Sequence, residues 1–334
     1  MSQITARFQH ASSLRRQTAM LSFLAIVLCL AVKTAHMAEP PAAWFTDAAL
    51  ERQRRLPVSL NWVNMPIRQS LAELARAQQV AILLDRRIVP GRTINLVARQ
   101  VALDDLLEQI GDKTDGATSW LDSVAYIGPR PAALRLRTLA ALRAADLQAL
   151  PKKARAVFLA KKPWLWGDLT ESRQLLAELA AEADVELNEL DLPHDLWPAA
   201  SLPPLSWIDR LTLLANEFDL TFQVLDGAHV RLVPIEEPVV IERGYPAGKQ
   251  GKELAARWKE MAPNAQIDLA RGKLIVRGRV EDHDRLTAPK PPPAADATTR
   301  PGAKVYTLAV SNQPLAAVLN TLRASSIEID VDEA

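Results

Sequence analysis

Histidines beside carboxylates are the residues of this chain that could perform metal or acid–base chemistry. The 334 residues include five histidines, and two of them have acidic neighbours, at His194–Asp195 and in the run Glu281–Asp284. Acidic residues at consecutive helical positions point in different directions and cannot all face one ion. In a first helical turn they complement the positive end of the helix dipole. We therefore expect this run to begin a helix, and we expect no metal site.

Signatures of catalysis are also missing from the sequence. There is no Ser-His-Asp spacing, no glycine-rich phosphate loop after a strand and no pair of carboxylates with a plausible pocket. The only cysteine is Cys29, so the chain beyond residue 38 has no disulfide and no thiolate ligand. The sequence predicts a protein that is not an enzyme, with no catalytic residue and no cofactor.

A G-x-x-G loop followed by a basic helix is the one pattern that suggests nucleic acid. The loop consists of Gly248, Lys249, Gln250 and Gly251. KH domains clamp a nucleic-acid backbone with a loop of this form. No helix is predicted before the loop, however, and the chain is expected to be exported. A plain turn at a helix start is therefore favoured, and nucleic-acid binding is kept as an alternative.

The eight tryptophans offer a choice between a binding platform and a core. A sugar-binding platform needs several of them exposed on one face. The tryptophans are instead spread along the chain, about one in each predicted element, which favours core anchors; they are Trp44, Trp62, Trp120, Trp164, Trp166, Trp197, Trp207 and Trp258.

An internal repeat sets the elements that position these residues. The segment Arg68–Ala75 (RQSLAELA) recurs 105 positions later as Arg173–Ala180 (RQLLAELA), and eight of fourteen positions match between Ile67–Val80 and Ser172–Val185. A third copy starts at Val305 and contains PLAAVLNTL. An internal repeat indicates structural units that pack their apolar faces in the same way.

The first unit has the pattern of strand, helix, strand, strand, helix and strand pair. Alternation at Val58, Leu60 and Trp62 predicts the first strand. Asn64 is expected to cap the helix that follows, with Pro66 in its first turn. The second unit keeps this order, with Asp226-Gly227 as the turn of its closing hairpin.

The third copy ends at Ala334 after only half of such a unit, which leaves its apolar face uncovered. We expect this half-unit to be completed by another chain, through an edge strand that carries Ile327, Ile329 and Val331.

Residues 57–129 resemble the short N-terminal (STN) domain of secretins and TonB-dependent receptors, also called the secretin N0 domain. The likeness lies in the ordered motifs VSLNWVNMPIRQSLAELA, VAILLD and YIGP, and residues 163–235 share it with a longer middle loop. Residues 238–286 are similar to the secretin N1 domain, which itself resembles the KH fold. The order of domains is similar to that of exported multi-STN proteins of planctomycetes.

This resemblance implies an α+β fold of tandem two-layer modules, βαβ-βαβ repeats followed by one βαββα module. The expected parts are a signal peptide or anchor (1–38), a first STN-like domain (57–130), a helical connector (131–162), a second STN-like domain (163–236), an N1/KH-like domain (238–286), a proline-rich linker (287–303) and an incomplete third STN-like half-domain (304–334). No pattern of a secretin pore or a TonB-dependent barrel is present.

The N-terminal segment predicts export. Residues 1–38 hold four basic residues and no acidic one, and residues 19–32 are apolar apart from Ser22. This stretch suits a signal peptide, because a spanning helix needs about 20 residues. The cleavage positions are poor, so an uncleaved anchor in the inner membrane through residues 19–32 stays open. Without the segment, 36 basic residues face 39 acidic ones, a balance of −3 that excludes a globally basic nucleic-acid binder.

Together these features predict a periplasmic or envelope adaptor that binds other envelope proteins and performs no chemistry. The partner could belong to a secretion or envelope transport assembly. One alternative is a signalling part that contacts a regulator, as in TonB-dependent transducers. A further alternative is nucleic-acid binding through the KH-like unit.

Overall fold

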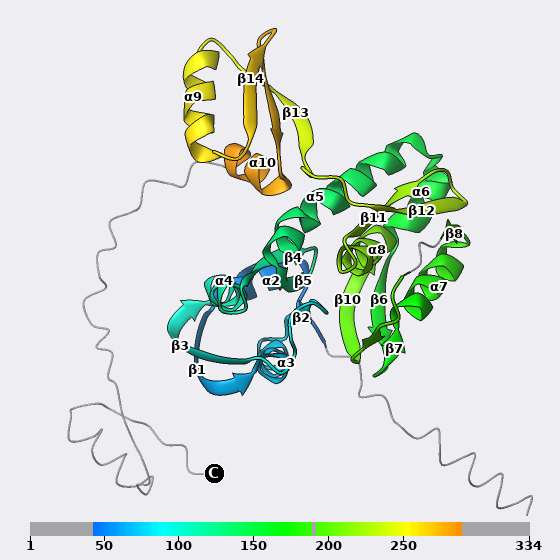
Figure 1. Ribbon diagram of the computed structural model, residues 1–334. Coiled ribbons are helices and arrows are strands. Elements are labelled where there is room, and N and C mark those ends of the chain that lie inside the picture. The colour runs from blue at the N-terminus through cyan, green and yellow to red at the C-terminus, as the bar shows by residue number, and fades with distance from the viewer. Residues whose placement is uncertain (1–42, 189–191, 289–334) are drawn as a thin grey trace, which may run out of the picture. The chain divides into compact units, whose positions relative to one another are not determined.

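The computed structural model describes residues 43–188 and 192–288 (Figure 1). The predicted signal segment, the third copy with Ile327, Ile329 and Val331, and nearly all of the proline-rich linker lie outside these residues. The described chain mixes helices with several small sheets, so the predicted α+β class of small modules is confirmed. Within residues 43–188 and 192–288, no helix combines the length and apolar character needed to cross a bilayer.

The first repeat follows a short helix, α2 (Asp47–Arg54), and forms two separate sheets. Strands β1 and β3 form an antiparallel ribbon, while β5 lies between β2, which is parallel to it, and β4, which is antiparallel. Helices α3 and α4 pack against these sheets. The elements are β1 (Pro57–Pro66), α3 (Ile67–Gln78), β2 (Ala81–Leu84), β3 (Thr93–Ala102), α4 (Leu103–Lys113), β4 (Gly116–Leu121) and β5 (Val124–Pro129).

The second repeat has the same strand pairing. Strand β6 pairs with β10, and β12 lies between parallel β8 and antiparallel β11. A short ladder of β7 with β9 continues the β6–β10 pair. The elements are β6 (Lys161–Trp166), β7 (Thr170–Glu171), α7 (Ser172–Ala183), β8 (Glu186–Asn188), β9 (Leu196–Trp197), β10 (Ala200–Ser206), α8 (Trp207–Asn216), β11 (Leu220–Val224) and β12 (His229–Pro234).

Helices α3 and α7 occupy equivalent places in the two repeats. Leu71 and Leu176, 105 positions apart, are both buried, at 3% and 0% exposure. Each helix ends in a residue of left-handed conformation, Gln79 (φ 52°) or Asp184 (φ 53°). In both cases the next backbone N–H bonds back to the same place in the last turn, from Val80 to Ala75 and from Val185 to Ala180. Nearly identical sequence therefore builds the same helix end twice.

The start of α3 differs from the prediction. Asn64 does not cap the helix; it lies inside β1 with φ of 53°, at a break in the register with β3. Pro66 is the residue before the helix and not part of its first turn. Its carbonyl oxygen accepts a hydrogen bond from Ser70 Oγ (2.9 Å). The prediction failed because asparagine tolerates left-handed backbone in a strand bulge as well as it caps helices.

A connector of helices joins the two repeats and fills the space between them. It contains α5 (Arg130–Asp146), a short 3₁₀ turn η2 (Leu147–Ala149) and α6 (Lys152–Leu159), with the break near Pro151 as expected. Helix α5 packs on β4 and β5 of the first repeat and on α8 and β11 of the second. The predicted bracing role of residues 131–162 is visible in these contacts (Figure 1).

A third module follows, with its own small core. Its antiparallel sheet has the order β13-β15-β14, and its elements are β13 (Ile241–Pro246), α9 (Gly251–Met261), β14 (Gln266–Ala270), β15 (Lys273–Gly278) and α10 (Val280–Thr287). Trp258 packs edge-on against Tyr245, with ring centres 5.2 Å apart, over Leu274 and Val276. The order strand, helix, two strands and helix agrees with the expected βαββα pattern.

Truncating either equivalent leucine should destabilise the chain to a similar extent. Leu71→Ala and Leu176→Ala each leave a cavity in a closed core, so we expect a loss of about 2–5 kcal/mol in the free energy of unfolding. Leu165→Ala, at a position 58% exposed, should change it by less than about 0.5 kcal/mol. Urea unfolding measures all three. A cost at only one of the two leucines would contradict their equivalence.

Candidate functional site

The residues singled out from the sequence lie apart from one another. Gly248–Gly251 forms an exposed turn between β13 and α9, with φ of 62° at Gly248 and only Gly251 buried. A strand and not a helix precedes the loop, as expected from the sequence, so it differs from the helix-flanked loop of KH domains. His194 is 68% exposed, and its Nε2 lies 3.5 Å from Glu171 Oε1.

The acidic run at Glu281–Asp284 begins α10, as predicted. Asp282 is buried, and its Oδ2 accepts the backbone N–H of Arg279 (3.0 Å), which satisfies the helix start. His283 is buried beside it; its Nδ1 pairs with Tyr245 OH (2.8 Å) and its Nε2 with the Ile241 carbonyl (3.2 Å). Burial lowers the pKa of His283, so the neutral ring is favoured, with Nε2–H donating to the Ile241 carbonyl and Nδ1 accepting from the Tyr245 hydroxyl. The run is a structural helix start.

The tryptophans belong to the core, as the sequence indicated. Six of the eight are at most 9% exposed, and Trp44 and Trp120 are partly buried against the cores. In the second repeat the rings of Trp164, Trp166 and Trp197 follow one another at centre distances of 4.8 and 5.8 Å. Side chains this deeply buried cannot present a flat face to a sugar.

The most concentrated polar chemistry lies at the junction between the two repeats, where the sequence analysis placed no site. It starts at the end of β2. Asp85 is fully buried, and its Oδ1 accepts the backbone N–H of Arg87 (2.7 Å), which forms a tight turn. The Arg87 guanidinium grips the same carboxylate through Nε (2.9 Å) and Nη2 (2.7 Å). Tyr126 OH, from the adjacent strand β5, donates a short hydrogen bond to Asp85.

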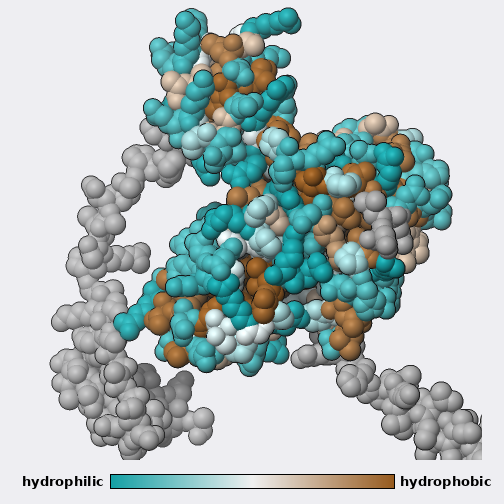
Figure 2. All heavy atoms as spheres, viewed as in Figure 1, coloured by the Kyte–Doolittle hydropathy of each residue, from teal (hydrophilic) through white to brown (hydrophobic). Residues whose placement is uncertain are grey.

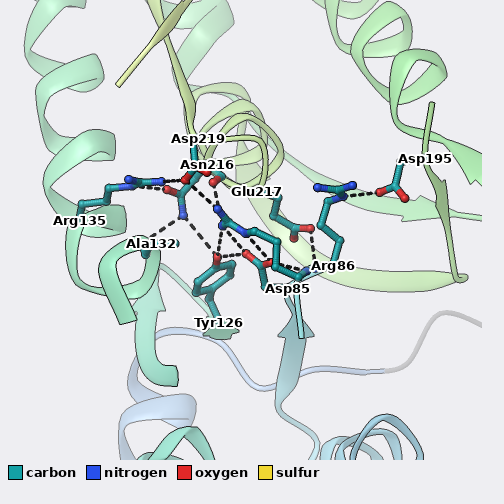
Figure 3. Close-up of polar contacts among 10 residues, drawn as sticks. Asp85, Arg86, Tyr126, Ala132, Arg135, Asp195, Asn216, Glu217 and Asp219 are labelled. Carbon is teal, nitrogen blue, oxygen red and sulfur yellow. Dashed lines mark hydrogen bonds and ion pairs between the residues drawn. The ribbon is translucent and has the colours of Figure 1, made fainter. Parts of the chain in front are cut away.

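The second repeat completes the cluster with the residues that end α8 (Figure 3). Arg87 Nη1 contacts Asp219 Oδ1 (2.7 Å), and Nη2 donates to the Asn216 carbonyl (3.0 Å). From α5, Arg135 donates to Asn216 Oδ1 (2.9 Å) and also pairs with Asp219. All three parts of the chain, two repeats and the connector, thus meet in one network of charged hydrogen bonds, which we call the junction cluster.

Charges in the junction cluster shift one another's ionisation. Burial lowers the pKa of Arg87, but its hydrogen bond and attraction to Asp85 outweigh this, so the pKa is raised and the guanidinium stays charged. Burial, followed by the negative charge of Asp85, raises the pKa of Tyr126 well above its usual value. Asp219 is affected oppositely: burial raises its pKa, but the hydrogen bonds from Arg135 and Arg87 lower it overall.

Glu217 is the exception in this cluster, because it is buried without a cation in hydrogen-bond contact. Its Oε2 accepts the backbone N–H of Arg86 (3.1 Å), while its Oε1 has no hydrogen-bond partner in the described chain. Burial, and then the nearby charge of Asp85, raises its pKa well above the usual value for glutamic acid. The protonated, neutral side chain is therefore favoured at this position.

Arg86 extends the cluster toward the surface. Its Nε donates to Asp195 Oδ2 (2.6 Å), which also accepts Trp197 Nε1–H (2.8 Å). Its guanidinium lies over the Phe218 ring, 4.7 Å from the centre. Across the two described ranges, no group of three or more His, Cys, Asp or Glu side chains could hold a metal ion. The cluster is thus a set of paired charges that ties the repeats together.

Comparisons with known proteins add no identification. The sequence matches no model of a known protein family, and no curated protein matches it significantly. The likeness to secretin and TonB-type short N-terminal domains remains a prediction from the motifs.

Glu217→Gln should remove a pH-dependent loss of stability. In the unfolded chain the carboxyl ionises above about pH 4.3, whereas burial keeps it protonated in the fold. The wild type therefore loses stability as the pH rises from that value toward the raised folded-state pKa, and the loss is constant above it. At pH 4 the variant should have a free energy of unfolding similar to that of the wild type. At pH 8 its free energy of unfolding should be higher than that of the wild type by more than about 1.4 kcal/mol, which is the free energy of one pKa unit.

Urea unfolding at pH 4, 6 and 8 makes this comparison. Glu236→Gln is the matched control, because Glu236 is exposed; it should reproduce the wild-type pH profile. If Glu217→Gln also reproduced that profile, the buried carboxyl would have an ordinary pKa.

Proposed function

We propose that this chain is a non-catalytic protein-interaction adaptor of the cell envelope, built from modules similar to the short N-terminal domains of secretins and TonB-dependent receptors. The observation that carries the proposal is the junction cluster. Its fully buried carboxylate, on Asp85, binds Arg87, and the Arg87 guanidinium also binds Asp219 of the neighbouring repeat. Charges that are paired in this way hold the two modules in one arrangement, as an adaptor requires.

A stiff pair of modules suits a protein that works by being bound, because little conformational freedom is lost on association. On the face drawn in Figure 2, hydrophilic residues cover most of the described surface, and hydrophobic residues appear in several separate areas. Recognition on this face therefore favours polar contacts or main-chain pairing over a broad apolar contact.

The expected partner contact is strand addition at the third copy of the repeat. Its candidate edge carries Ile327, Ile329 and Val331, which lie outside the described residues. Main-chain hydrogen bonds supply most of the affinity in such a contact, so a residue without an N–H weakens it.

Ile329→Pro should abolish capture of the envelope partner by the tagged chain, because proline cannot donate the strand hydrogen bond. Ile329→Val keeps the N–H and the β-branched shape and should capture it normally. Cross-linking in intact cells, followed by purification from the envelope fraction, compares the two with a chain that lacks residues 303–334. Undiminished capture by the deletion would contradict strand addition at this edge. A secretion component as the partner supports the adaptor role, and a regulator supports the signalling alternative.

Nucleic-acid binding is a second candidate because of the surface around the G-x-x-G loop. Lys249, Lys252, Arg257 and Lys259 are exposed, and none of them is ion-paired to another described residue. Such unpaired cations beside a helix start could follow a phosphate backbone.

This candidate function predicts that the chain binds single-stranded RNA. The logarithm of the binding constant should fall linearly with the logarithm of the salt concentration. The double variant Lys249→Glu with Lys252→Glu should then lose the binding. The control pair Lys152→Glu with Lys153→Glu, exposed on α6, should retain it. Fluorescence polarisation with a labelled oligonucleotide provides the measurement, and equal loss in both pairs would leave only non-specific charge attraction.

A further inference from the structure

A surface cavity of about 330 Å³ lies beside the junction cluster. This is within the range of about 300–1,000 Å³ typical of small-ligand sites. The residues that line it are Arg86, Arg87, Leu192, Pro193, Glu217, Phe218, Asp219 and Leu220. It therefore combines two arginines of the first repeat with two acidic residues and four apolar side chains of the second.

Arg86 is the group in this cavity that has binding capacity to spare. Only its Nε is engaged, with Asp195, and the Phe218 ring holds the plane of the guanidinium. Its two terminal nitrogens have no hydrogen-bond partner within the described chain, and the side chain is 29% exposed. A guanidinium fixed in this way presents a two-pronged donor, the geometry that matches a carboxylate.

The other charged groups at the cavity do not compete for this role. Arg87 and Asp219 also line it, but each is bound to the other and to further members of the junction cluster. Glu217 lines it with Oε1 unpartnered, and its protonated form adds no negative charge to repel an anion. The apolar side chains provide a place for a hydrophobic group next to the anion.

We infer that this cavity binds a carboxylate attached to a carbon that carries an apolar side chain, the chemistry found at the C-terminus of a peptide ending in a residue such as leucine. Arg86 grips the carboxylate, and Phe218 and Leu220 contact the apolar side chain. The inference rests on the proposed adaptor function, for which it names a partner feature. A free small acid of the same chemistry would fit the same groups.

Binding of the labelled peptide fluorescein-Gly-Gly-Gly-Leu to the full chain tests the inference by fluorescence polarisation. The free acid should bind at least about tenfold more tightly than its C-terminal amide, since a charge-assisted hydrogen bond supplies that factor. Arg86→Gln and Arg86→Lys should both weaken binding of the acid by a similar factor, because lysine lacks the planar fork. Arg92→Gln, at an exposed ion pair with Asp115 in the same repeat, should change it less than twofold.

Competition with unlabelled N-acetyl-leucine separates the two sources of the carboxylate. If N-acetyl-leucine competes at least tenfold more weakly than the unlabelled peptide, the site binds the end of a peptide chain. If the two compete equally, the site binds a small acid. Equal binding of the acid and the amide, or no binding of the acid, would overturn the inference. The comparison of acid with amide needs no variant, so it stands even if Arg86→Gln does not fold. Capture of the envelope partner through the third copy of the repeat is measured in a separate experiment. A failure of peptide binding at this cavity is therefore distinguishable from a failure of the adaptor function.

Discussion

Burial of one sheet on both of its faces is the constraint on which the rest of this structure depends. Along β5, Ala125 and Ile127 face the core of the first repeat, while Val124 and Tyr126 face the core shared with α5 and the second repeat. A strand covered on both sides has no water to satisfy polar groups near its end. The Tyr126 hydroxyl and the Asp85 carboxylate, which lie at that end, must therefore find partners within the protein. Arg87 and the residues that close α8 provide them.

The two repeats share one backbone turn, but the aspartate in that turn forms different ion pairs in each. Asp115 and Asp219, 104 positions apart, both follow the second helix of their repeat and share left-handed backbone, with φ of 57° and 58°. Asp115 pairs with exposed Arg92 at the surface, whereas Asp219 binds two arginines at the junction. The turn is thus a property of the repeated fold, and its ionic role is a property of the neighbour that each copy meets.

Sequence patterns predicted what depends on local chemistry and missed what depends on packing between modules. The repeat of Leu71 and Leu176, the hairpins and the helix start at Glu281 could be read because periodicity and turn residues act over a few positions. Asn64 was assigned wrongly because its preference for unusual backbone fits two local structures. The motif ending in Asp85 marked the end of a strand, but no local signal indicates that Glu217, more than 130 positions away, comes to lie beside it.

The junction cluster is better explained by specificity than by stability. Replacing buried ion pairs with apolar residues often leaves a protein equally or more stable, so paired charges such as Asp85 and Arg87 are weak evidence of added stability. Two modules with nearly the same apolar helix stripe could, however, pack against each other in more than one register. A different register would separate Arg87 and Arg135 from Asp219 and Asn216 of the second repeat. Arg135, which is almost fully buried, would then lose its partners, which is destabilising for a buried charge. The charges thus select one arrangement of two like modules, and that same arrangement forms the cavity at Arg86 from residues of both.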